Sequence, residues 1–201
     1  MVKNKLMFFA KGLKNPIQGY RYFRMLQRRV YYKIKFNIFN RNVHIGKNFR
    51  AFGKLSIKGP GKVFIGDNVE IQGLVTPWTH SKEAEIFIGN NSRLDATRFG
   101  SEIRIVIGQN CILGDECRIL DTDFHSIYPS RRDDPKFIKT KPVIVGDNVW
   151  VTMRCVILKG VTIGANSTVL PNSTVSRNIP EWSICGGNPA AIIKKIDQEY
   201  L

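Results

Sequence analysis

The sequence lacks several features that would place the protein in a familiar class. No apolar run approaches the roughly 20 residues that a membrane-spanning helix needs, and LMFFA at 6–10 is too short for the core of a signal peptide. We therefore expect a protein that stays in the cytoplasm. The four cysteines form no C-x-x-C pair and lack the nearby histidines of a zinc site, so we expect neither disulfides nor a structural metal.

Acidic residues are absent from the first third of the chain. Residues 1–66 hold 16 lysines and arginines and no aspartate or glutamate, and the remainder is nearly neutral, with 15 basic and 16 acidic residues. A groove for nucleic acid along the whole chain would not segregate charge in this way, so we expect no nucleic-acid partner. The composition, 43% hydrophobic over 201 residues, predicts one main globular domain with a basic accessory arm.

The second half of the chain repeats with a period of six. Aliphatic residues recur at every sixth position, and a small or medium-sized residue stands four places after each of the first five. A helix would space apolar residues by three and four, so the period of six predicts short strands that turn after each hexad. The aliphatic positions are Val145, Val151, Ile157, Ile163, Val169 and Val175, and the small positions are Val149, Cys155, Val161, Ser167 and Ser173.

Three such hexads make one triangular coil of a parallel β-helix, which is an all-β fold. Stacked coils would gather the aliphatic residues into an internal column, whose burial at about 25 cal/mol per Å² supplies most of the stability. Cys111, Cys117 and Cys155 fall at the small interior position, which favours packing over a redox role. The domain should run from about 43 to 185. Turns are predicted at GDN (66–68), GNN (89–91), GQN (108–110), GDN (146–148) and GAN (164–166).

Four motifs carry a resemblance to a known family. They are DTDFHSI (121–127), KPVIVGDNVW (141–150), VILKGVTIGANS (156–167) and GGNPAAIIKKI (186–196). In this order the chain resembles the hexapeptide-repeat acyltransferases, in the bacterial branch of maltose, galactoside and polysaccharide O-acetyltransferases. The resemblance implies a left-handed coil, a homotrimer, acetyl-CoA as the acyl donor and active sites between subunits. It also implies that residues 186–201 form a turn and a short C-terminal helix.

A polar cluster surrounds the last histidine of the chain. Asp121, Asp123 and His125 are two apart, so an extended segment would point all three to one side. The stretch 126–142 has no hexad pattern and is predicted to protrude as a loop. His125 is either a turn histidine or a general base, and a base contributes roughly 10²- to 10⁴-fold. The resemblance implies the base, while Asp121 and Asp123 either orient its ring or cap the turn.

The resemblance also implies a set of residues that bind acetyl-CoA. Matching the W-I-G-x motif of the family to WVTM (150–153) makes the amide of Met153 a donor to the thioester oxygen, with Trp150 lining the same cleft. The remaining candidates are Ser176, Arg177, Lys194 and Lys195. The three basic residues among them would contact the phosphates of the cofactor, but a role in surface solubility explains any one of them equally well.

Two positions depart from the pattern of the family. Thr152 stands where the family has Gly, and LPN (170–172) stands where it has Gly-Ala-Gly. Pro171 has no N–H to donate to the cofactor. Because one hydrogen bond is worth about 0.5 to 1.5 kcal/mol, we expect weaker binding of the donor rather than its loss.

The acceptor and the arm are less well defined by the sequence. The segment 74–85 breaks the period, which predicts a loop that presents Trp78 and His80 either to a sugar acceptor or to solvent; Arg131 of the protruding loop is a third candidate. The arm, residues 1–42, is predicted to contain a helix that either lies on the anionic inner face of the membrane or packs on the end of the coil. Its apolar side would consist of Tyr22, Met25, Leu26, Val30 and Ile34.

Together these features predict an acetyl-CoA-dependent O-acetyltransferase that acts on a sugar hydroxyl in the synthesis of cell-envelope polysaccharide or lipopolysaccharide. An N-acetyltransferase of an amino sugar and a non-catalytic trimeric scaffold are the alternatives. A zinc carbonic anhydrase on the same coil would need three metal-binding histidines. The chain has only His44, His80 and His125, without the H-x-x-x-x-H spacing, so we expect no metal.

Overall fold

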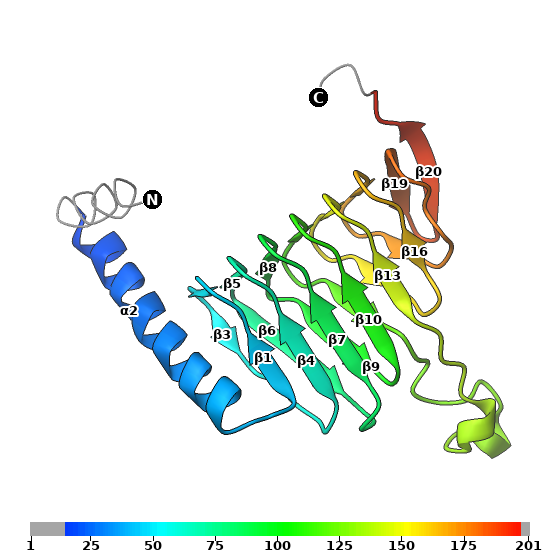
Figure 1. Ribbon diagram of the computed structural model, residues 1–201. Coiled ribbons are helices and arrows are strands. Elements are labelled where there is room, and N and C mark those ends of the chain that lie inside the picture. Colours follow the sequence, from blue (N-terminus) through cyan, green and yellow to red (C-terminus); the bar gives the residue numbers. More distant parts are fainter. Residues whose placement is uncertain (1–14, 198–201) are drawn as a thin grey trace.

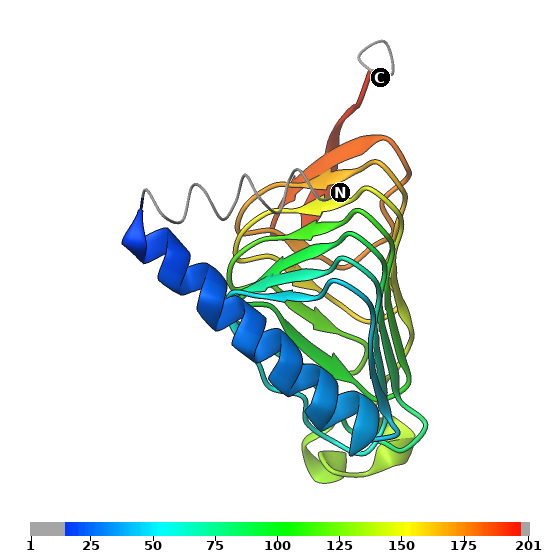
Figure 2. The ribbon, with the colours of Figure 1, turned by 60° about the vertical axis from the view of Figure 1, so that its left-hand side comes forward.

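The computed structural model describes residues 15–197. Its body is a parallel β-helix of triangular coils, as the period of six predicts, and the helix α2 lies across the N-terminal end (Figures 1 and 2). Each coil contributes one short strand to each of three sheets, and all strands but the last run parallel to their neighbours.

The three sheets form the three faces of a prism. The first sheet contains β1 (Val43–Ile45), β4 (Lys62–Ile65), β7 (Glu85–Ile88), β10 (Arg104–Ile107), β13 (Val143–Val145) and β16 (Thr162–Ile163). The second contains β2 (Arg50–Ala51), β5 (Glu70–Gln72), β8 (Arg93–Asp95), β11 (Ile112–Leu113), β14 (Trp150–Val151), β17 (Thr168–Val169), β19 (Ser183–Gly187) and β20 (Ala190–Lys195). The third contains β3 (Lys54–Leu55), β6 (Leu74–Thr79), β9 (Arg98–Ser101), β12 (Arg118–Leu120), β15 (Val156–Ile157) and β18 (Thr174–Val175).

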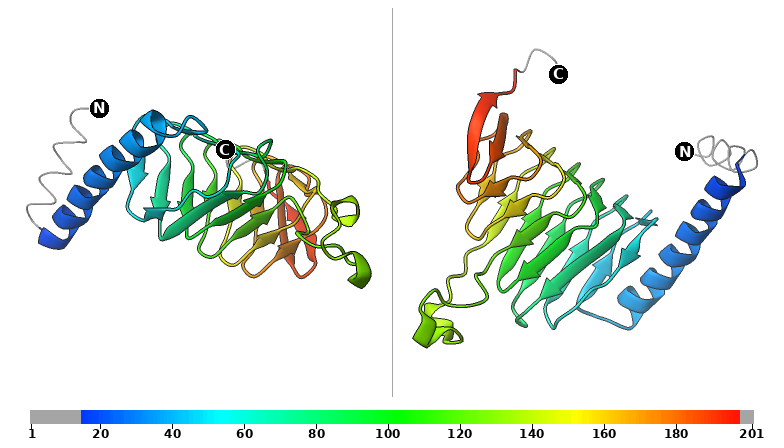
Figure 3. Two further views of the ribbon diagram at one scale, coloured as in Figure 1. Left: turned by 90° about the horizontal axis from the view of Figure 1, so that it is seen from below. Right: turned by 180° about the vertical axis from the view of Figure 1, so that it is seen from behind.

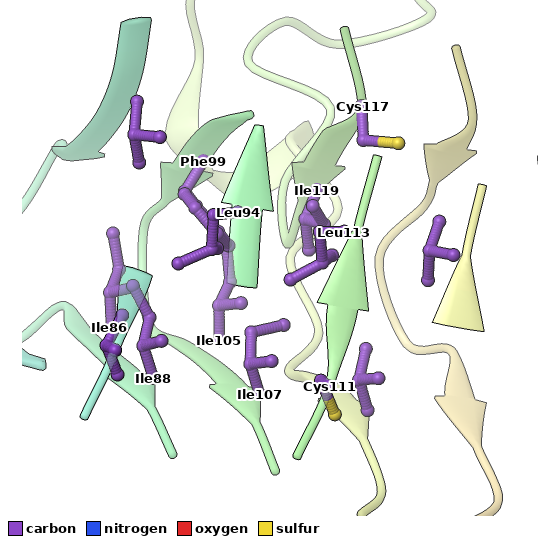
Figure 4. Close-up of a cluster of buried hydrophobic side chains, with 14 of the residues drawn as sticks. Ile86, Ile88, Leu94, Phe99, Ile105, Ile107, Cys111, Leu113, Cys117 and Ile119 are labelled. Atoms are coloured by element: carbon purple, nitrogen blue, oxygen red, sulfur yellow. The ribbon is translucent and has the colours of Figure 1, made fainter. Parts of the chain in front are cut away.

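The interior consists of the hexad positions. All six aliphatic residues from Val145 to Val175 are buried, and so are the five small residues between them. Figure 4 shows the same interior in the preceding coils, where Ile107, Leu113 and Ile119 are buried. All four cysteines are buried and free, and Cys111, Cys117 and Cys155 pack in the interior, as their hexad position predicts. Burial raises the pKa of the Cys111 and Cys185 thiols to about 11, because the thiolate would lose its hydration.

The predicted turns form at the corners of the prism, and asparagine is the residue that adopts the left-handed backbone. Asn68 (φ 58°) and Asn166 (φ 59°) are two examples among the GDN-type motifs. The Asn148 side chain donates to the Asn166 Oδ1 on the next coil at 3.0 Å, so these corners are also joined by side chains. Glycine is needed for close stacking, because a Cβ on Gly164 would lie 2.2 Å from the backbone nitrogen of Glu181.

Two expected elements are different in the structure. The segment 74–85 is not a loop throughout, because β6 occupies residues 74–79 and alternates exposed and buried side chains within the third sheet. The predicted C-terminal helix is wrong: β19 and β20 form an antiparallel hairpin. The β-branched pair Ile192–Ile193 favours a strand, and Ile184 and Cys185 of β19 offer it an open sheet edge.

The described part of the arm contains the predicted helix. α2 (Pro16–Tyr32) is capped by Asn15, whose side chain accepts from the amides of Ile17 and Gln18, and it continues into the π-helical turn η1 (Lys33–Ile38). Met25, Tyr32 and Phe36 are buried, and the Tyr32 hydroxyl accepts from the Leu55 amide at 2.9 Å. One side of the helix therefore covers the first coil. Residues 1–14 of the arm and 198–201 lie outside the described part.

The buried side of α2 differs from the predicted apolar stripe. Of its five residues, Met25 is buried, whereas Val30 and Ile34 are 58% and 46% exposed. Arginines occupy the buried side instead: Arg28 donates to the Gly53 carbonyl at 3.1 Å and Arg29 to the Asn48 side chain at 3.3 Å. A coil end presents free backbone carbonyls, and guanidinium groups satisfy them where aliphatic side chains could not.

Candidate functional site

A long excursion interrupts the coil between β12 and β13. Residues 121–142 leave the corner between the third and first sheets, as predicted for 126–142, and contain the short helices η2 (Pro129–Arg131) and η3 (Pro135–Phe137) (Figure 3). Thr122 and Thr140 pair at its base, and their hydroxyls are 3.0 Å apart. The excursion is thus a protruding loop that is closed at its neck.

His125 lies on this loop and is 66% exposed. Its Nδ1 is 3.1 Å from Oδ1 of Asp133, which lies on the far side of the same loop. A carboxylate at this distance fixes the orientation of the ring and leaves Nε2 free to exchange a proton. Sequence reasoning missed Asp133, although the doubled acid Asp133–Asp134 in a loop beside the histidine was a usable signal.

Asp121 does not share the surface of His125. It is fully buried, and its carboxylate accepts four hydrogen bonds of 2.7 to 3.0 Å from the segment 101–104. The expectation that Asp121, Asp123 and His125 point to one side is therefore wrong. It assumed an extended backbone, whereas Phe124 between them has φ 61° in the left-handed region.

Asp123 is bound to a lysine of the next coil. Its carboxylate makes a short ion pair with the Lys159 Nζ, and both side chains are about a quarter exposed. The contact joins the start of the loop to the turn between β15 and β16. It holds Asp123 at the same corner as His125 without contact with the imidazole.

Three aromatic rings gather at this corner. Trp78, at the end of β6, stacks on His80 with centroids 4.6 Å apart, and His80 meets Phe124 edge-on at 4.9 Å. Lys58 lies over the Trp78 ring at 5.1 Å. Trp78 and His80 therefore lie beside the loop of His125, and β6 rather than a loop presents Trp78. The cluster also includes Phe124, which sequence reasoning did not select.

Arg131 is tied to the loop itself. Its guanidinium lies 3.6 Å from the Asp134 carboxylate and 5.5 Å from the centre of the Phe137 ring. The structure therefore places Arg131 in the framework of the loop rather than among the aromatic rings of Trp78 and His80.

The residues expected to bind acetyl-CoA fall into separate groups. Trp150 is half exposed on the second sheet, between Ile112 and Thr168 of the adjacent strands. Met153 and Pro171 follow at the corner between the second and third sheets, where the Asn172 amide donates to the Met153 carbonyl at 3.1 Å. Lys194 and Lys195 lie on β20 beside β19 in that second sheet, and the Lys195 Nζ donates to the Glu181 carbonyl at 2.9 Å.

Ser176 and Arg177 belong to a different corner. They follow β18 of the third sheet and precede Ile179, which pairs with Ile163 of the first sheet. This is the edge that also carries His125. Within one chain, the third sheet separates Met153 from His125, so one prism does not bring the predicted donor residues and the predicted base into one cleft.

Thr152 is accommodated where the family has glycine. The side chain is 7% exposed, and its hydroxyl donates to the Val169 carbonyl at 2.7 Å. The substitution thus adds a hydrogen bond between adjacent coils and leaves Met153 on the surface. Among the described residues, no group of three or more histidine, cysteine or acidic side chains is arranged to hold a metal.

Comparisons with known proteins agree with this architecture. The sequence model described as "Bacterial transferase hexapeptide (six repeats)" matches residues 142–177. The putative lipopolysaccharide biosynthesis O-acetyl transferase WbbJ of Escherichia coli K12 is 26% identical over 191 residues, 87% of this chain and 86% of the relative. The chain therefore carries the hexapeptide repeat and is similar to acetyltransferases built on it.

Solved structures of acetyltransferases share this fold. The polysialic acid O-acetyltransferase OatWY is 29% identical with a TM-score of 0.66, covering 76% of this chain and 74% of that one. The acetyltransferase VCA0836 of Vibrio cholerae O1 biovar eltor, solved with acetyl coenzyme A, shares the fold at 21% identity, with a TM-score of 0.58 over 93% and 92% of the two chains. The chain spans 30% to 45% of three other related acetyltransferases.

Proposed function

We propose that the enzyme transfers an acetyl group from acetyl-CoA to a hydroxyl of a sugar, with His125 as the general base. The supporting observation is the hydrogen bond between His125 and Asp133 on a loop beside Trp78 and His80. Acetyl-CoA supplies the activated thioester. His125 would take the proton of the attacking hydroxyl at Nε2, and Asp133 would stabilise the imidazolium that forms.

The aromatic rings fit a sugar acceptor. Trp78 is 45% exposed, and a large aromatic face buries the apolar side of a sugar ring while the hydroxyls remain free for hydrogen bonds. His80 stacks on the indole of Trp78, and the Phe124 ring packs edge-on against His80, so both contacts hold the indole in position. A hydroxyl of a sugar placed on Trp78 would face the loop of His125.

The surface around Trp150 fits the acyl donor. Ile112, Trp150 and Met153 are each between 41% and 51% exposed on one face and its adjoining corner. This apolar surface suits the pantetheine arm, the Met153 amide would donate to the thioester oxygen, and Lys194 would approach a phosphate. Pro171 cannot donate a backbone hydrogen bond at the next coil.

A homotrimer would complete the site. The base and the donor-binding surface lie on different edges of one prism, and Trp150, Met153 and Ile144 leave apolar area exposed on the body. If a second copy packs against the first, the Trp150 surface of one copy would face the His125 loop of the other. The contact would exclude water from the Trp150 surface and from the loop. This arrangement is our proposal for how the chain assembles.

The role of His125 can be tested with purified enzyme, acetyl-CoA and a panel of sugars, with the acetylated product detected by mass spectrometry. His125→Ala should lower kcat by about 10²- to 10⁴-fold without changing the melting temperature. His44→Ala, which removes an exposed histidine of β1, is the matched control and should retain full turnover. Near-normal kcat in His125→Ala would remove this residue from the mechanism.

The same panel separates the alternatives. Hydroxylamine cleaves an ester but leaves an amide, so loss of the added acetyl group identifies O-acetylation, and its retention on an amino sugar identifies N-acetylation. A non-catalytic scaffold would acetylate none of the sugars. Calorimetry would then show no binding of acetyl-CoA.

We further propose that α2 holds the enzyme on an anionic membrane surface, in the cytoplasm, during the synthesis of envelope polysaccharide. None of the described helices is long and apolar enough to cross a membrane. The face of α2 and η1 turned away from the coil is nevertheless apolar, with side chains between 46% and 73% exposed. These are Ile17, Tyr20, Phe23, Val30, Tyr31 and Ile34.

Charge on the same helix favours anionic lipid. Arg21 and Arg24 of α2 and Lys35 of η1 are exposed, and neither element contains an acidic residue. Each lysine or arginine near an anionic bilayer contributes about 1 kcal/mol, and the aromatic residues suit the headgroup region. The inner side of α2 caps the coil, so the two roles considered for the arm use opposite sides of one helix.

Liposome co-sedimentation tests this contact. Full-length protein should bind vesicles with anionic headgroups and not neutral vesicles, and salt should weaken binding. Reversing the charge of Arg21 and Arg24 to Glu should weaken it at least about 30-fold, since two contributions are lost and two repulsions appear. The loop variant Lys136→Glu/Lys139→Glu is the matched control and should bind normally. Failure of the full-length protein to bind at low salt would end the membrane proposal.

A further inference from the structure

Charges on two of the three sheets are balanced between neighbouring coils. On the second sheet, Glu70 lies between Arg50 at 2.9 Å and Arg93 at 3.6 Å. On the first sheet, Glu85 lies between Lys62 at 3.6 Å and Arg104 at 3.8 Å. In each case an acid on one coil separates two bases on the coils above and below.

The third sheet breaks this rule. Arg98 of β9 and Arg118 of β12 are direct register partners on adjacent strands, with Thr76 and Val156 as their outer neighbours. Both arginines point outward and are exposed. Within residues 15–197 neither guanidinium has an ion pair or a hydrogen bond, whereas like charges at one strand spacing, about 4.8 Å, repel each other.

The two arginines line a shallow depression. It encloses about 290 Å³, and its wall includes Arg154 and Glu116 of the adjacent turns. Those two side chains form an ion pair of 3.1 Å, so Glu116 is already matched by Arg154. The net charge of the depression is therefore that of Arg98 and Arg118, and it can receive an anionic group.

The depression lies on the same outer face as the aromatic rings. Gly100 and Leu120 follow Arg98 and Arg118 by two residues, or about 7 Å along their strands, and Gly100 is the register partner of Trp78. A Cβ on Gly100 would lie 2.7 Å from the Phe124 ring. Phe124 covers the buried Gly100, so the outer face of the third sheet runs from the two guanidinium groups over Phe124 to Trp78 and the loop of His125.

We infer that the acceptor is an anionic sugar, whose carboxylate or phosphate is held by Arg98 and Arg118 while a sugar ring stacks on Trp78. This inference rests on the proposed acetyl transfer. Two parallel guanidinium groups on adjacent strands can each offer paired N–H donors to anionic oxygens, and the anion removes their mutual repulsion. A neutral sugar of the same size would leave both arginines unmatched.

Acceptor kinetics with matched sugars test the inference. An oligosaccharide of uronic acids is compared with its carboxyl-reduced counterpart, and a nucleotide diphosphate sugar with the free sugar. The wild-type enzyme should show a lower KM for the charged member of at least one pair, which also identifies the anionic group as carboxylate or phosphate. Arg98→Gln/Arg118→Gln should raise that KM by about 10- to 100-fold.

Controls separate recognition from folding and from assembly. The KM for acetyl-CoA, kcat at saturating acceptor, the oligomeric mass and the melting temperature should be unchanged in the double variant. Arg104→Gln, which removes a paired arginine of the first sheet, should leave all acceptor constants unchanged. Arg98→Lys/Arg118→Lys should recover part of the affinity, because charge is kept and the planar fork is lost.

The possible failures are distinct. If the wild-type enzyme acetylates none of the sugars, the proposed function fails. If it acetylates charged and neutral members equally well, or the double variant keeps the preference, the acceptor is not held by this pair and the inference is wrong. A changed oligomeric mass in the double variant would show that an acid of a second copy fills the depression, which also overturns it.

Discussion

Replacing Asp121 by asparagine should destabilise the fold rather than act on the chemistry. The carboxylate is fully buried and accepts from the Ser101 hydroxyl and from the amides of Glu102, Ile103 and Arg104. Three of these donors converge on Oδ2 and one on Oδ1. An asparagine can keep its oxygen at the crowded position, but its NH₂ group then faces the Glu102 amide, donor against donor.

The size of the effect follows from this geometry. One hydrogen bond to a charged group is lost, a buried N–H is left without an acceptor, and the remaining three bonds lose their charge assistance. Hydrogen bonds to charged groups are worth about 1.5 to 3 kcal/mol and an unsatisfied buried donor costs about 1 to 3 kcal/mol, so we expect a loss of about 3 to 5 kcal/mol. For a chain of this size the melting temperature should fall by about 10 °C.

Thermal melts and acceptor kinetics on Asp121→Asn and Asp133→Asn separate the two carboxylates. Asp133 is 88% exposed, so its variant should melt within about 2 °C of the wild type and should lose turnover, about tenfold or more, because the ring of His125 is no longer oriented. Well below its melting temperature, Asp121→Asn should retain most of its kcat. An Asp121→Asn enzyme that melts normally but turns over slowly would refute this assignment.

Two further predictions concern the donor site and the thiols. Pro171→Ala restores a backbone N–H at the corner beside Met153 and should tighten acetyl-CoA by up to about tenfold in calorimetry; unchanged or weaker affinity would show that the amide is not used. Burial raises the pKa of the Cys111 and Cys185 thiols from 9.0 to about 11, so the folded protein keeps protons that the unfolded chain releases. The contribution of these two thiols to the free energy of unfolding should therefore be constant below about pH 9 and fall toward pH 11; urea titrations of wild type against Cys111→Ala/Cys185→Ala that show the same pH dependence above pH 9 would contradict it.

The repeat itself was determined by the sequence. Each coil depends on its own turn residues and on the coil next to it. A period of six, with turns that end in asparagine such as Asn68, is therefore enough to predict the stacked coils, the buried aliphatic column and the interior cysteines. The protruding loop beside His125 also followed from the point where the period stops. Local signals were sufficient because the interactions that build the coil are nearly local.

The tertiary structure decided which side chains meet. The Asp121 carboxylate accepts its hydrogen bonds from segment 101–104, about 20 positions earlier in the chain. Asp133 takes its place beside His125, because the left-handed backbone of Phe124 changes the direction of the chain. The aromatic cluster joins two coils through His80 and Phe124. Such contacts depend on the stacking register and on the path of an irregular loop, and neither carries a periodic signal in the sequence.

The two ends of the solenoid followed the same principle. At the C-terminus, the open edge of β19 turned a segment predicted as helix into β20. At the N-terminus, the helix was predictable, but its orientation was set by the free carbonyl of Gly53 and the free amide of Leu55, which bind Arg28 and Tyr32. A terminal coil must satisfy its own backbone, and the partner that does so is chosen by three-dimensional proximity rather than by hydrophobic spacing.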